Sequence, residues 1–297
     1  MHSKLLNIVF WGEDSFSDVV LKSLVREGCR VRLVISPLYD NSIYKRLENT
    51  CRKFDITFRR YPNVNSDEVV EQVKTVSPDL CVIAHFEKIL KPPLLEIPRL
   101  GFINLHPSLL PDYRGLAPQH WPIINGESKT GVTVHYVDSG IDTGDIILQE
   151  HIEISQDMYV SDLQKRWIGI YNHIVIDAIQ RILNHSPVIP QPAQTGRYYG
   201  KLKEEQCRFK LTDNCGYVYN LIRGVSMPYH GAEINNILLW KVHYPDAVTQ
   251  SSIMGNYTTN GIYRNTEYGD FLRLSDGVLL IDKYQLKDGK DDNCHFE

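Results

Sequence analysis

The sequence predicts an α/β protein in which a Rossmann-like, mostly parallel sheet with helices on both faces precedes a smaller, β-rich, barrel-like C-terminal domain. Over the first 183 of 297 residues, short apolar runs alternate with amphipathic stretches, which is the pattern of βαβ units. Residues 184–200 contain three prolines and few helix formers, as is typical of an extended linker. The rest holds short strand-like runs between Gly, Asn and Asp turns. We therefore predict domains at 1–183 and 201–297, joined by a linker at 184–200.

The elements follow from local periodicity. Short apolar runs predict parallel strands at 5–11, 31–35, 56–59, 80–84 and 101–105. Helices are expected between them at 17–27, 43–54 and 66–76, the first and the last with an apolar stripe. Strands 131–137 and 145–154 are joined by a short polar loop, which predicts antiparallel pairing at one side of the sheet, and a long helix at 161–183 closes the domain. In the second domain we expect strands at 242–244, 261–263, 271–274 and 278–281.

Composition and charge narrow the class of protein. The net charge is −4, whereas proteins that grip a nucleic-acid backbone usually carry a basic excess; nucleic acid is therefore not the expected partner. Six cysteines lie far apart without a C-x-x-C pair, so neither a zinc site nor a disulfide framework is predicted. The N-terminus lacks a signal-peptide layout and no apolar run approaches eighteen residues. We expect a reduced cytoplasmic protein that has no membrane partner and binds no metal.

The first predicted strand-to-helix turn, residues 11–16, lacks G-x-G-x-x-G and carries two acidic residues. Those acids stand where a pyrophosphate would need bare backbone donors. No P-loop motif occurs either. The sequence thus points away from dehydrogenases and P-loop NTPases, although ligands should still gather at the carboxyl ends of the strands.

The strand 101–105 ends with Asn104 and His106, followed by Pro107. Residues two apart on a strand point to the same face, so the amide and the imidazole can meet one ligand. The amide can donate to a developing oxyanion, and the imidazole can exchange a proton near neutral pH. Taken alone, the pair fits a buried strand end with a core histidine better than a catalytic site.

A second polar run, residues 138–145, has three acids and two glycines between two strands. Its spacing fits no EF-hand, because that loop needs acids at alternate positions and a distal Glu. Alone, the run could be a solvated turn or a weak cation site.

Together these two segments carry a resemblance. From residue 102 to 149 the chain resembles the N10-formyltetrahydrofolate-dependent formyltransferases, with Asn-x-His at 104–106, S-L-L-P at 108–111 and D-x-G-x-D-x-G at 138–144. The resemblance implies that Asn104, His106 and Asp142 are catalytic and that N10-formyltetrahydrofolate is the formyl donor. It places the folate between two segments, at Phe86, Ile89, Leu90, Val137, Asp138, Gly140 and Ile141. Plain core packing explains Phe86, Ile89 and Leu90 equally well.

Three acceptors occur in enzymes of this kind: methionyl-tRNA, glycinamide ribonucleotide and amino sugars on nucleotide carriers. The two-domain length disfavours the second. The short, nearly neutral segment 37–42 and the run from Trp121 to His135 resemble the sugar enzymes more than the tRNA enzymes. We therefore predict a nucleotide-linked amino deoxysugar, a cell-surface polysaccharide precursor, as the acceptor and methionyl-tRNA as the alternative. A non-catalytic module of the same fold is a further alternative.

A sugar nucleotide needs a surface on which its base can stack and a cation for its pyrophosphate. The expected substrate-binding residues are Trp11, Gly12, Ser108, Arg114, Tyr198, Tyr199, Lys201, Lys203, Arg223 and Tyr229. For each cation or aromatic residue among these, a surface or packing role is the alternative. The sequence leaves open the nucleotide (TDP, UDP, GDP or CMP) and the sugar. We expect a homodimer that forms through the β-rich domain.

Overall fold

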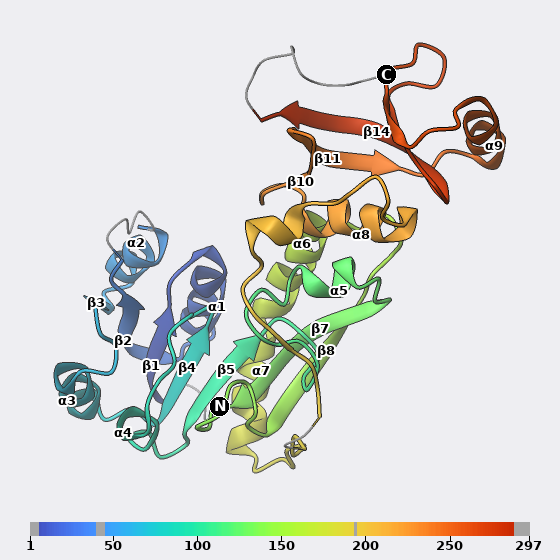
Figure 1. Ribbon diagram of the computed structural model, residues 1–297. Helices are drawn as coiled ribbons and strands as arrows, with labels where there is room; N and C mark the ends of the chain where they lie inside the picture. The colour runs from blue at the N-terminus through green and yellow to red at the C-terminus, as the bar shows by residue number, and fades with distance from the viewer. Residues whose placement is uncertain (1–5, 40–44, 193–194, 288–297) are drawn as a thin grey trace. The chain divides into compact units, whose positions relative to one another are not determined.

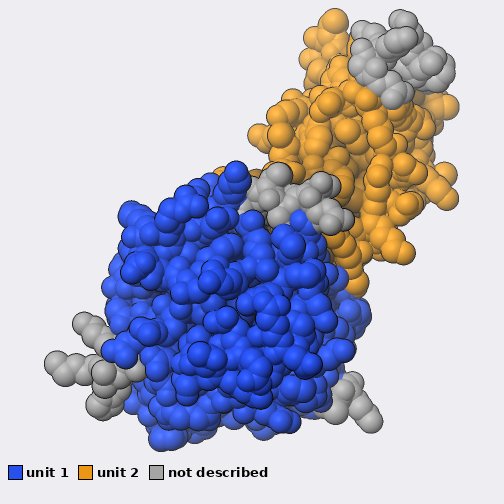
Figure 2. All heavy atoms as spheres, turned by 90° about the vertical axis from the view of Figure 1, so that its left-hand side faces the viewer, with its two compact units in different colours: residues 1–116, 130–152, 166–199 blue, residues 117–129, 153–165, 200–297 orange. Residues whose placement is uncertain are grey.

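The computed structural model describes residues 6–39, 45–192 and 195–287, and these form two compact units, coloured separately in Figure 2. The first unit comprises residues 1–116, 130–152 and 166–199, and the second comprises 117–129, 153–165 and 200–297. Two short excursions of the chain thus belong to the second unit. Residues 184–199, where the sequence suggests a linker, belong to the first.

The first unit is built on a seven-stranded sheet (Figure 1). In spatial order its strands are β3 (Thr57–Tyr61), β2 (Arg30–Pro37), β1 (Asn7–Gly12), β4 (Leu80–Ala84), β5 (Phe102–His106), β7 (Lys129–Tyr136) and β8 (Ile146–Glu153). The first five are parallel, whereas β7 pairs antiparallel with β5. The predicted mostly parallel sheet is confirmed. Because β2 and β3 extend it to one side of β1 while β4 and β5 extend it to the other, the strand order reverses between β1 and β4.

Helices cover both faces of this sheet, as the alternation of side chains on β1 requires. Val9 and Trp11 belong to a buried cluster with α3 (Asp67–Val76) and α4 (Pro92–Leu95). Ile8 and Phe10 point to the opposite face and are fully buried. On that face α1 (Ser15–Arg26) contacts α2 (Arg46–Lys53) and α7 (Ile174–Leu183).

The predicted helix 161–183 is wrong in one respect, because the structure has two helices there, α6 (Val160–Tyr171) and α7. The break falls at Asn172 and His173. The Asn172 carbonyl accepts from Ser23 Oγ at 2.7 Å and from Arg26 Nη2 at 2.6 Å, both on α1. A carbonyl engaged by another element is turned out of the helical ladder, and apolar periodicity does not report such a contact.

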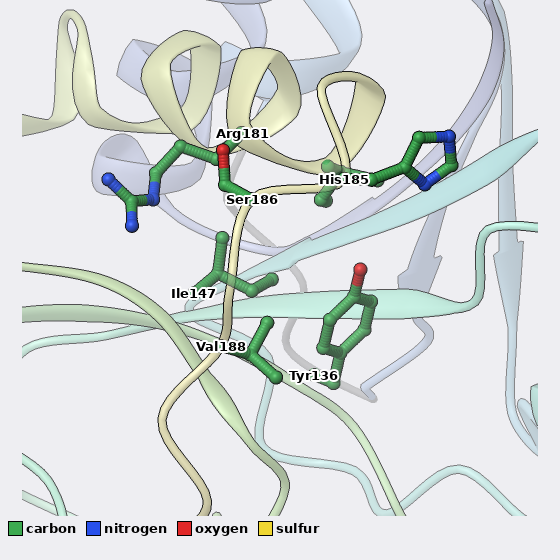
Figure 3. Close-up of a pocket in the computed structure, with 7 residues that line it drawn as sticks. Tyr136, Ile147, Arg181, His185, Ser186 and Val188 are labelled. Atoms are coloured by element: carbon green, nitrogen blue, oxygen red, sulfur yellow. The ribbon is translucent and has the colours of Figure 1, made fainter.

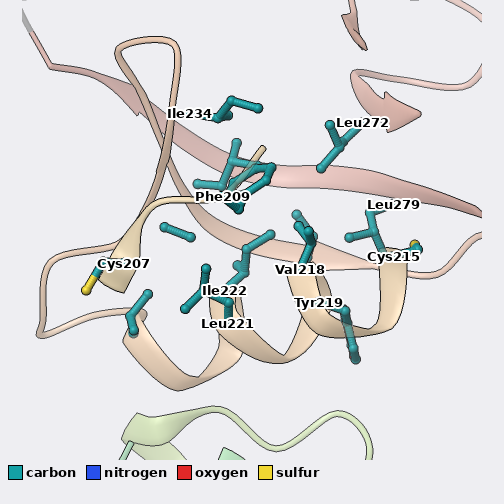
Figure 4. Packing of buried hydrophobic residues seen from close by; sticks show 14 of the residues in the cluster. Cys207, Phe209, Cys215, Val218, Tyr219, Leu221, Ile222, Ile234, Leu272 and Leu279 are labelled. Carbon is teal, nitrogen blue, oxygen red and sulfur yellow. The ribbon is translucent and has the colours of Figure 1, made fainter. Parts of the chain in front are cut away.

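The second unit pairs a five-stranded antiparallel half-barrel with one buried helix. The sheet order is β10 (Ala232–Ile234), β11 (Ile237–His243), β14 (Gly277–Leu286), β13 (Phe271–Leu274) and β12 (Gly261–Tyr263). Helix α8 (Cys215–Val225) lies under the sheet, and Val218, Leu221 and Ile222 face Leu272 and Leu279 (Figure 4). The predicted β-rich domain is confirmed.

Further elements complete the units. They are the strands β6 (Arg114–Gly115) and β9 (Tyr198–Tyr199), the helices α5 (Trp121–Ile124) and α9 (Ala247–Asn256), and a 3-10 turn η2 (Glu204–Cys207). Five cysteines are free and buried, and Cys294 lies outside the described residues. Within the described ranges, no helix is long and apolar enough to cross a membrane.

Candidate active site

The catalytic candidates of β5 lie at the carboxyl end of the parallel sheet, beside β7. In the antiparallel ladder Asn104 is opposite His135, and His106 is opposite Thr133. Phe102 and Val137 join the cluster on the α3 and α4 face, so the alternation of side chains places Asn104, His106 and His135 on that same face.

Asp142 brings a carboxylate to these side chains. Its Oδ2 lies 3.6 Å from His106 Nδ1, and its Oδ1 lies 3.5 Å from His135 Nε2 and 3.4 Å from Asn104 Nδ2. Asn104 Nδ2 also lies 3.2 Å from His135 Nε2. The structure therefore brings together all three residues that the sequence predicts as catalytic. It adds His135, which sequence reasoning noted only as a family likeness.

The hydrogen bonds fix which ring nitrogen of each histidine carries a proton. His106 Nε2 lies 2.8 Å from the carbonyl oxygen of Tyr113, which can only accept, so Nε2 is the donor. In the neutral ring, Nδ1 is then the basic nitrogen and faces Asp142. His135 donates from Nδ1 to the carbonyl of Tyr136 at 2.7 Å and, when Nε2 also carries a proton, from Nε2 to Asp142 Oδ1 at 3.5 Å.

Burial decides the charge states. Burial lowers the pKa of His106, although the Asp142 carboxylate and the Tyr113 carbonyl oppose this shift. Burial would raise the pKa of Asp142, but His106, His135 and the backbone N–H of Gly115 hold this pKa well below its usual range. At neutral pH the site thus holds an ionised carboxylate beside a neutral imidazole whose basic nitrogen faces it. An imidazolium formed at His106 would be stabilised at once by Asp142.

Backbone groups hold Asp142 in an uncommon conformation. Its φ of 53° lies in the left-handed region, which a non-glycine residue adopts only under constraint. Its Oδ2 accepts from the backbone N–H of Gly115 at 2.8 Å. Gly115 has a φ of 94°, and a Cβ there would lie 2.4 Å from the carbonyl oxygen of Tyr199. Glycine is therefore required at this position.

The 108–111 loop packs beneath the site. Thr133 Oγ1 donates to the Ser108 carbonyl at 2.7 Å and accepts from the Leu110 N–H at 3.1 Å. Ser108 is fully buried, and its hydroxyl donates to the carbonyl of Asp112 at 2.8 Å. The prediction that Ser108 binds substrate is therefore wrong, because its side chain is used in folding the loop.

Two segments bear the predicted folate contacts. Leu90 is buried, and Phe86 and Val137 pack against the same cluster. Ile89 and Ile141, one on each segment, are 64% and 42% exposed. Asp138 accepts from the Gly140 N–H at 3.0 Å and from Thr143 Oγ1 at 2.6 Å, which shapes the loop before Asp142. Exposed apolar side chains on two segments joined by one core cluster are consistent with an apolar slot, and these contacts stay a prediction.

The predicted nucleotide contacts near β1 are contradicted by burial. Trp11 is fully buried, and its ring packs edge-on against Phe86 at 5.7 Å, so no face is available to a base. Gly12 is buried too, and a Cβ there would lie 2.6 Å from Ser17. The helix N-terminus that follows is already capped, because Asp14 accepts from the N–H groups of Phe16 and Ser17.

Two predicted phosphate cations serve the fold. Arg223 is 4% exposed and donates to the carbonyls of Ser155 and Met158 at 3.2 and 2.9 Å. Arg114 is 7% exposed and donates to the carbonyls of Asp142 and Thr195 at 3.1 and 3.0 Å. Both buried guanidinium groups donate to backbone oxygens and to one side-chain amide oxygen, that of Gln191 for Arg114 and that of Asn220 for Arg223. The prediction of phosphate contacts is therefore wrong for them.

The other predicted substrate contacts stay predictions. Tyr198 is 58% exposed, and Tyr199 stacks on Tyr113 at 4.9 Å, both in the first unit. In the second unit Lys201 and Lys203 are exposed. Tyr229 accepts from Gln164 Nε2 at 2.5 Å and is partly buried.

A cavity of about 290 Å³ lies elsewhere in the first unit, between β7, β8 and the end of α7 (Figure 3). Its lining residues are Tyr136, Ile147, Arg181, Ile182, His185, Ser186 and Val188. Tyr136 follows His135 on β7 and so points to the opposite face of the sheet. The cavity is therefore separate from the catalytic candidates, and none of the predicted site residues lines it. Among the described residues, no three His, Cys, Asp or Glu side chains are placed to hold a metal ion.

Comparison with known proteins assigns the chain to a class of enzyme. Residues 4–179 match the formyl transferase family model, and residues 201–294 match that of the formyl transferase C-terminal domain. The chain therefore belongs to the formyl transferase family and is an N-formyltransferase.

Sequence relatives and solved structures extend this likeness over both units. A methionyl-tRNA formyltransferase of Syntrophus aciditrophicus is 35% identical, covering 76% of this chain and 75% of the relative. One from Ruminiclostridium cellulolyticum is 30% identical, covering 96% and 93%. An N-formyltransferase of Helicobacter canadensis, solved with folinic acid and dTDP-3-aminofucose, has a TM-score of 0.69 at 20% identity, covering 93% of this chain and 99% of that one. A sugar 3-N-formyltransferase named WlaRD, solved with dTDP and 5-N-formyl-THF, has a TM-score of 0.67 at 20% identity, covering 94% and 99%. At 20% identity the likeness concerns the fold.

Proposed function

We propose that this enzyme transfers the formyl group of N10-formyltetrahydrofolate to the amino group of a nucleotide-linked amino deoxysugar, a precursor of cell-surface polysaccharide. The transfer half of the proposal rests on one observation: Asp142 lies within 3.6 Å of His106 Nδ1 and 3.4 Å of Asn104 Nδ2, at the carboxyl end of the sheet. Ligands of open α/β sheets bind at that end.

Asn104, His106 and Asp142 have distinct parts in the proposed reaction. The neutral amine forms a bond to the formyl carbon, the formyl oxygen gains negative charge, and the bond to the folate nitrogen then breaks. Asn104 gives up its long 3.4 Å contact with Asp142 and donates to the charged oxygen. His106 takes the amine proton at Nδ1 and returns it to the departing nitrogen. Asp142 stabilises the imidazolium between these two steps.

Surface charge supports a small acceptor over a tRNA. From residue 201 on, acidic residues slightly outnumber Lys and Arg. Several of the cations there are engaged: Lys287 pairs with Glu204 and Glu233 at 3.0 and 2.9 Å, and Arg208 pairs with Glu233 at 3.3 Å. Binding of tRNA draws most of its affinity from cations that neutralise phosphates.

Methionyl-tRNA is the second candidate, because the sequence relatives named above carry that name and one of them covers 96% of this chain. The two solved structures, one with dTDP-3-aminofucose and one with dTDP, are compatible with the first candidate through their fold. The predicted homodimer and the predicted cytoplasmic location stay predictions.

One assay decides between the two acceptors. The protein is incubated with N10-formyltetrahydrofolate and, separately, with TDP-, UDP-, GDP- and CMP-linked amino sugars and with charged methionyl-tRNA. Mass spectrometry then detects the gain of a formyl group. We expect formylation of at least one sugar nucleotide and a strongly reduced gain of formyl with His106→Ala. Formylation of the tRNA alone would overturn the sugar acceptor, and donor binding without product from any acceptor would overturn the proposed transfer.

A further inference from the structure

We propose that the segment after α7 is an active-site strap, and that its residue Gln191 positions the carboxylate of Asp142 for formyl transfer. The strap is defined as residues 189–192 and 195–199, all within the first unit. The inference rests on the proposed role of Asp142 in the reaction.

Gln191 contacts the loop of Asp142 through both atoms of its amide. Its Nε2 donates to the carbonyl of Asp142 at 3.1 Å and to that of Gly144 at 2.7 Å. Its Oε1 accepts from Arg114 Nη2 at 2.8 Å. One side chain thus joins both ends of the turn that carries Asp142.

Arg114 and Gln191 together form a clamp on Asp142. Its Nε donates to the Asp142 carbonyl at 3.1 Å, so that this oxygen receives one hydrogen bond from Arg114 and one from Gln191. Its Nη1 donates to the carbonyl of Thr195 at 3.0 Å, farther along the strap. The adjacent residue, Gly115, donates its N–H to the carboxylate itself. The main chain and the side chain of Asp142 are therefore fixed by one continuous set of donors.

The clamp keeps Asp142 in its left-handed backbone conformation. Asp142 has a left-handed φ of 53°, and a non-glycine residue persists there only when its surroundings impose it. Without donors at the carbonyl, the turn can relax and carry Oδ2 away from His106. A shift of about 1 Å at a reacting group can lower a rate about 100-fold.

The strap is itself anchored on the first unit, as a positioning element must be. Ile189 forms a two-way bridge with Ile146, with both N–H···O contacts at 2.8 Å. At its other end β9 pairs in parallel with β6, and Tyr199 stacks on Tyr113. Gly196 has a φ of 91°, and a Cβ there would lie 1.9 Å from the carbonyl oxygen of Pro111. Backbone contacts therefore fix the strap on both sides of Gln191.

A purely structural role for Gln191 can be separated from positioning by a matched residue. Asn260, in the second unit, also donates its amide to a main-chain carbonyl, that of Leu211 at 2.8 Å, and accepts from an arginine, Arg273. Both amides are partly buried. Gln191→Met and Asn260→Leu each remove the amide while keeping the shape of the side chain.

The experiment compares these variants in formyl transfer from N10-formyltetrahydrofolate to a dTDP-linked 3-amino sugar. We expect Gln191→Met to lower kcat about 10- to 100-fold with little change in the KM for the donor. Both substitutions should lower Tm by a similar amount, but Asn260→Leu should leave kcat unchanged. Hydrogen exchange followed by mass spectrometry requires no acceptor, and it should show faster exchange in residues 138–145 for Gln191→Met alone.

Combination with Asp142→Asn tests whether Gln191 acts through Asp142. In that background Gln191→Met should cause no further loss, because the carboxylate that it positions is gone. Losses that multiply, a wild-type kcat in Gln191→Met, or equal losses of kcat in both amide variants would each overturn the strap. A wild-type kcat in Asp142→Asn would instead overturn the catalytic assignment on which the strap rests.

Discussion

His106 in the first unit and His120 in the second are alike in burial and in one hydrogen bond. Each is 4% exposed. His106 donates from Nε2 to the Tyr113 carbonyl at 2.8 Å, and His120 donates from Nδ1 to the Gly224 carbonyl at 2.7 Å. Burial lowers the pKa of both, that of His120 to about 4.

The two histidines differ in the group that lies on the other side of the ring. The remaining nitrogen of His106 faces the carboxylate of Asp142, whereas the ring of His120 packs edge-on against Tyr229 at 4.3 Å. With a backbone carbonyl and an aromatic ring as its neighbours, His120 stays neutral and joins α5 to α8. The carboxylate beside His106 supports the proton transfer that we propose for this imidazole. Burial alone therefore does not identify a catalytic histidine.

The largest effect is expected from the catalytic pair of the first unit. His106→Ala or Asp142→Ala should lower kcat by about 10³-fold, since general acid–base catalysis typically contributes 10²–10⁴-fold. Circular dichroism should show a retained fold. The matched control, His120→Gln, should keep kcat. Wild-type-like turnover of either first-unit variant would remove the contrast between the two histidines.

A somewhat smaller loss is expected for Asn104→Ala. Removing one donor to a developing oxyanion typically lowers kcat by about 10²–10³-fold. Because that hydrogen bond forms only as the oxygen gains charge, the KM for the formyl donor should change little. Steady-state kinetics with both substrates varied will measure this split. A raised KM with an unchanged kcat would mean that Asn104 only binds substrate.

In the second unit, His120 should make the free energy of unfolding depend on pH in the acid range. The folded pKa of His120, about 4, lies below its usual 6.5, so only the unfolded state gains a proton between these values. The free energy of unfolding therefore falls as pH drops from 6.5 to 4, by about 3 kcal/mol for this group. His120→Gln should lose less stability over that range in urea unfolding. Parallel pH curves for the two proteins would show that His120 is not the group responsible.

The smallest effect concerns the pH dependence of turnover. Because burial lowers the pKa of His106, its basic form persists below pH 6.5 and is lost only as pH falls through the lowered value. We therefore expect kcat to fall by less than about twofold between pH 7.5 and 6.5. His120→Gln should leave this profile in place while changing the stability curve. A midpoint of the kcat profile at or above pH 6.5 would contradict the lowered pKa of His106.

Patterns along the chain predicted much of the first unit. Alternating apolar runs predicted the parallel strands. The resemblance of the Asn-x-His and Asp-x-Gly segments to the formyltransferases predicted the catalytic candidates that the structure brings within 3.6 Å. Both signals are local, since strand period and motif spacing are read within a few residues. His135 could not be found in this way, because only the structure shows that it lies opposite Asn104 on the neighbouring strand and therefore shares its face.

The sequence by itself thus determined the class of fold, the reaction class through resemblance, and the residue types at the site. Only the tertiary structure decided that Trp11 and Ser108 are buried, that Arg114 and Arg223 serve backbone carbonyls, and that Gln191 reaches the turn of Asp142 from 49 positions away. The reason is physical. Periodicity and capping act over a few residues, whereas the burial of a side chain and the partners of a hydrogen bond depend on which distant segments pack together.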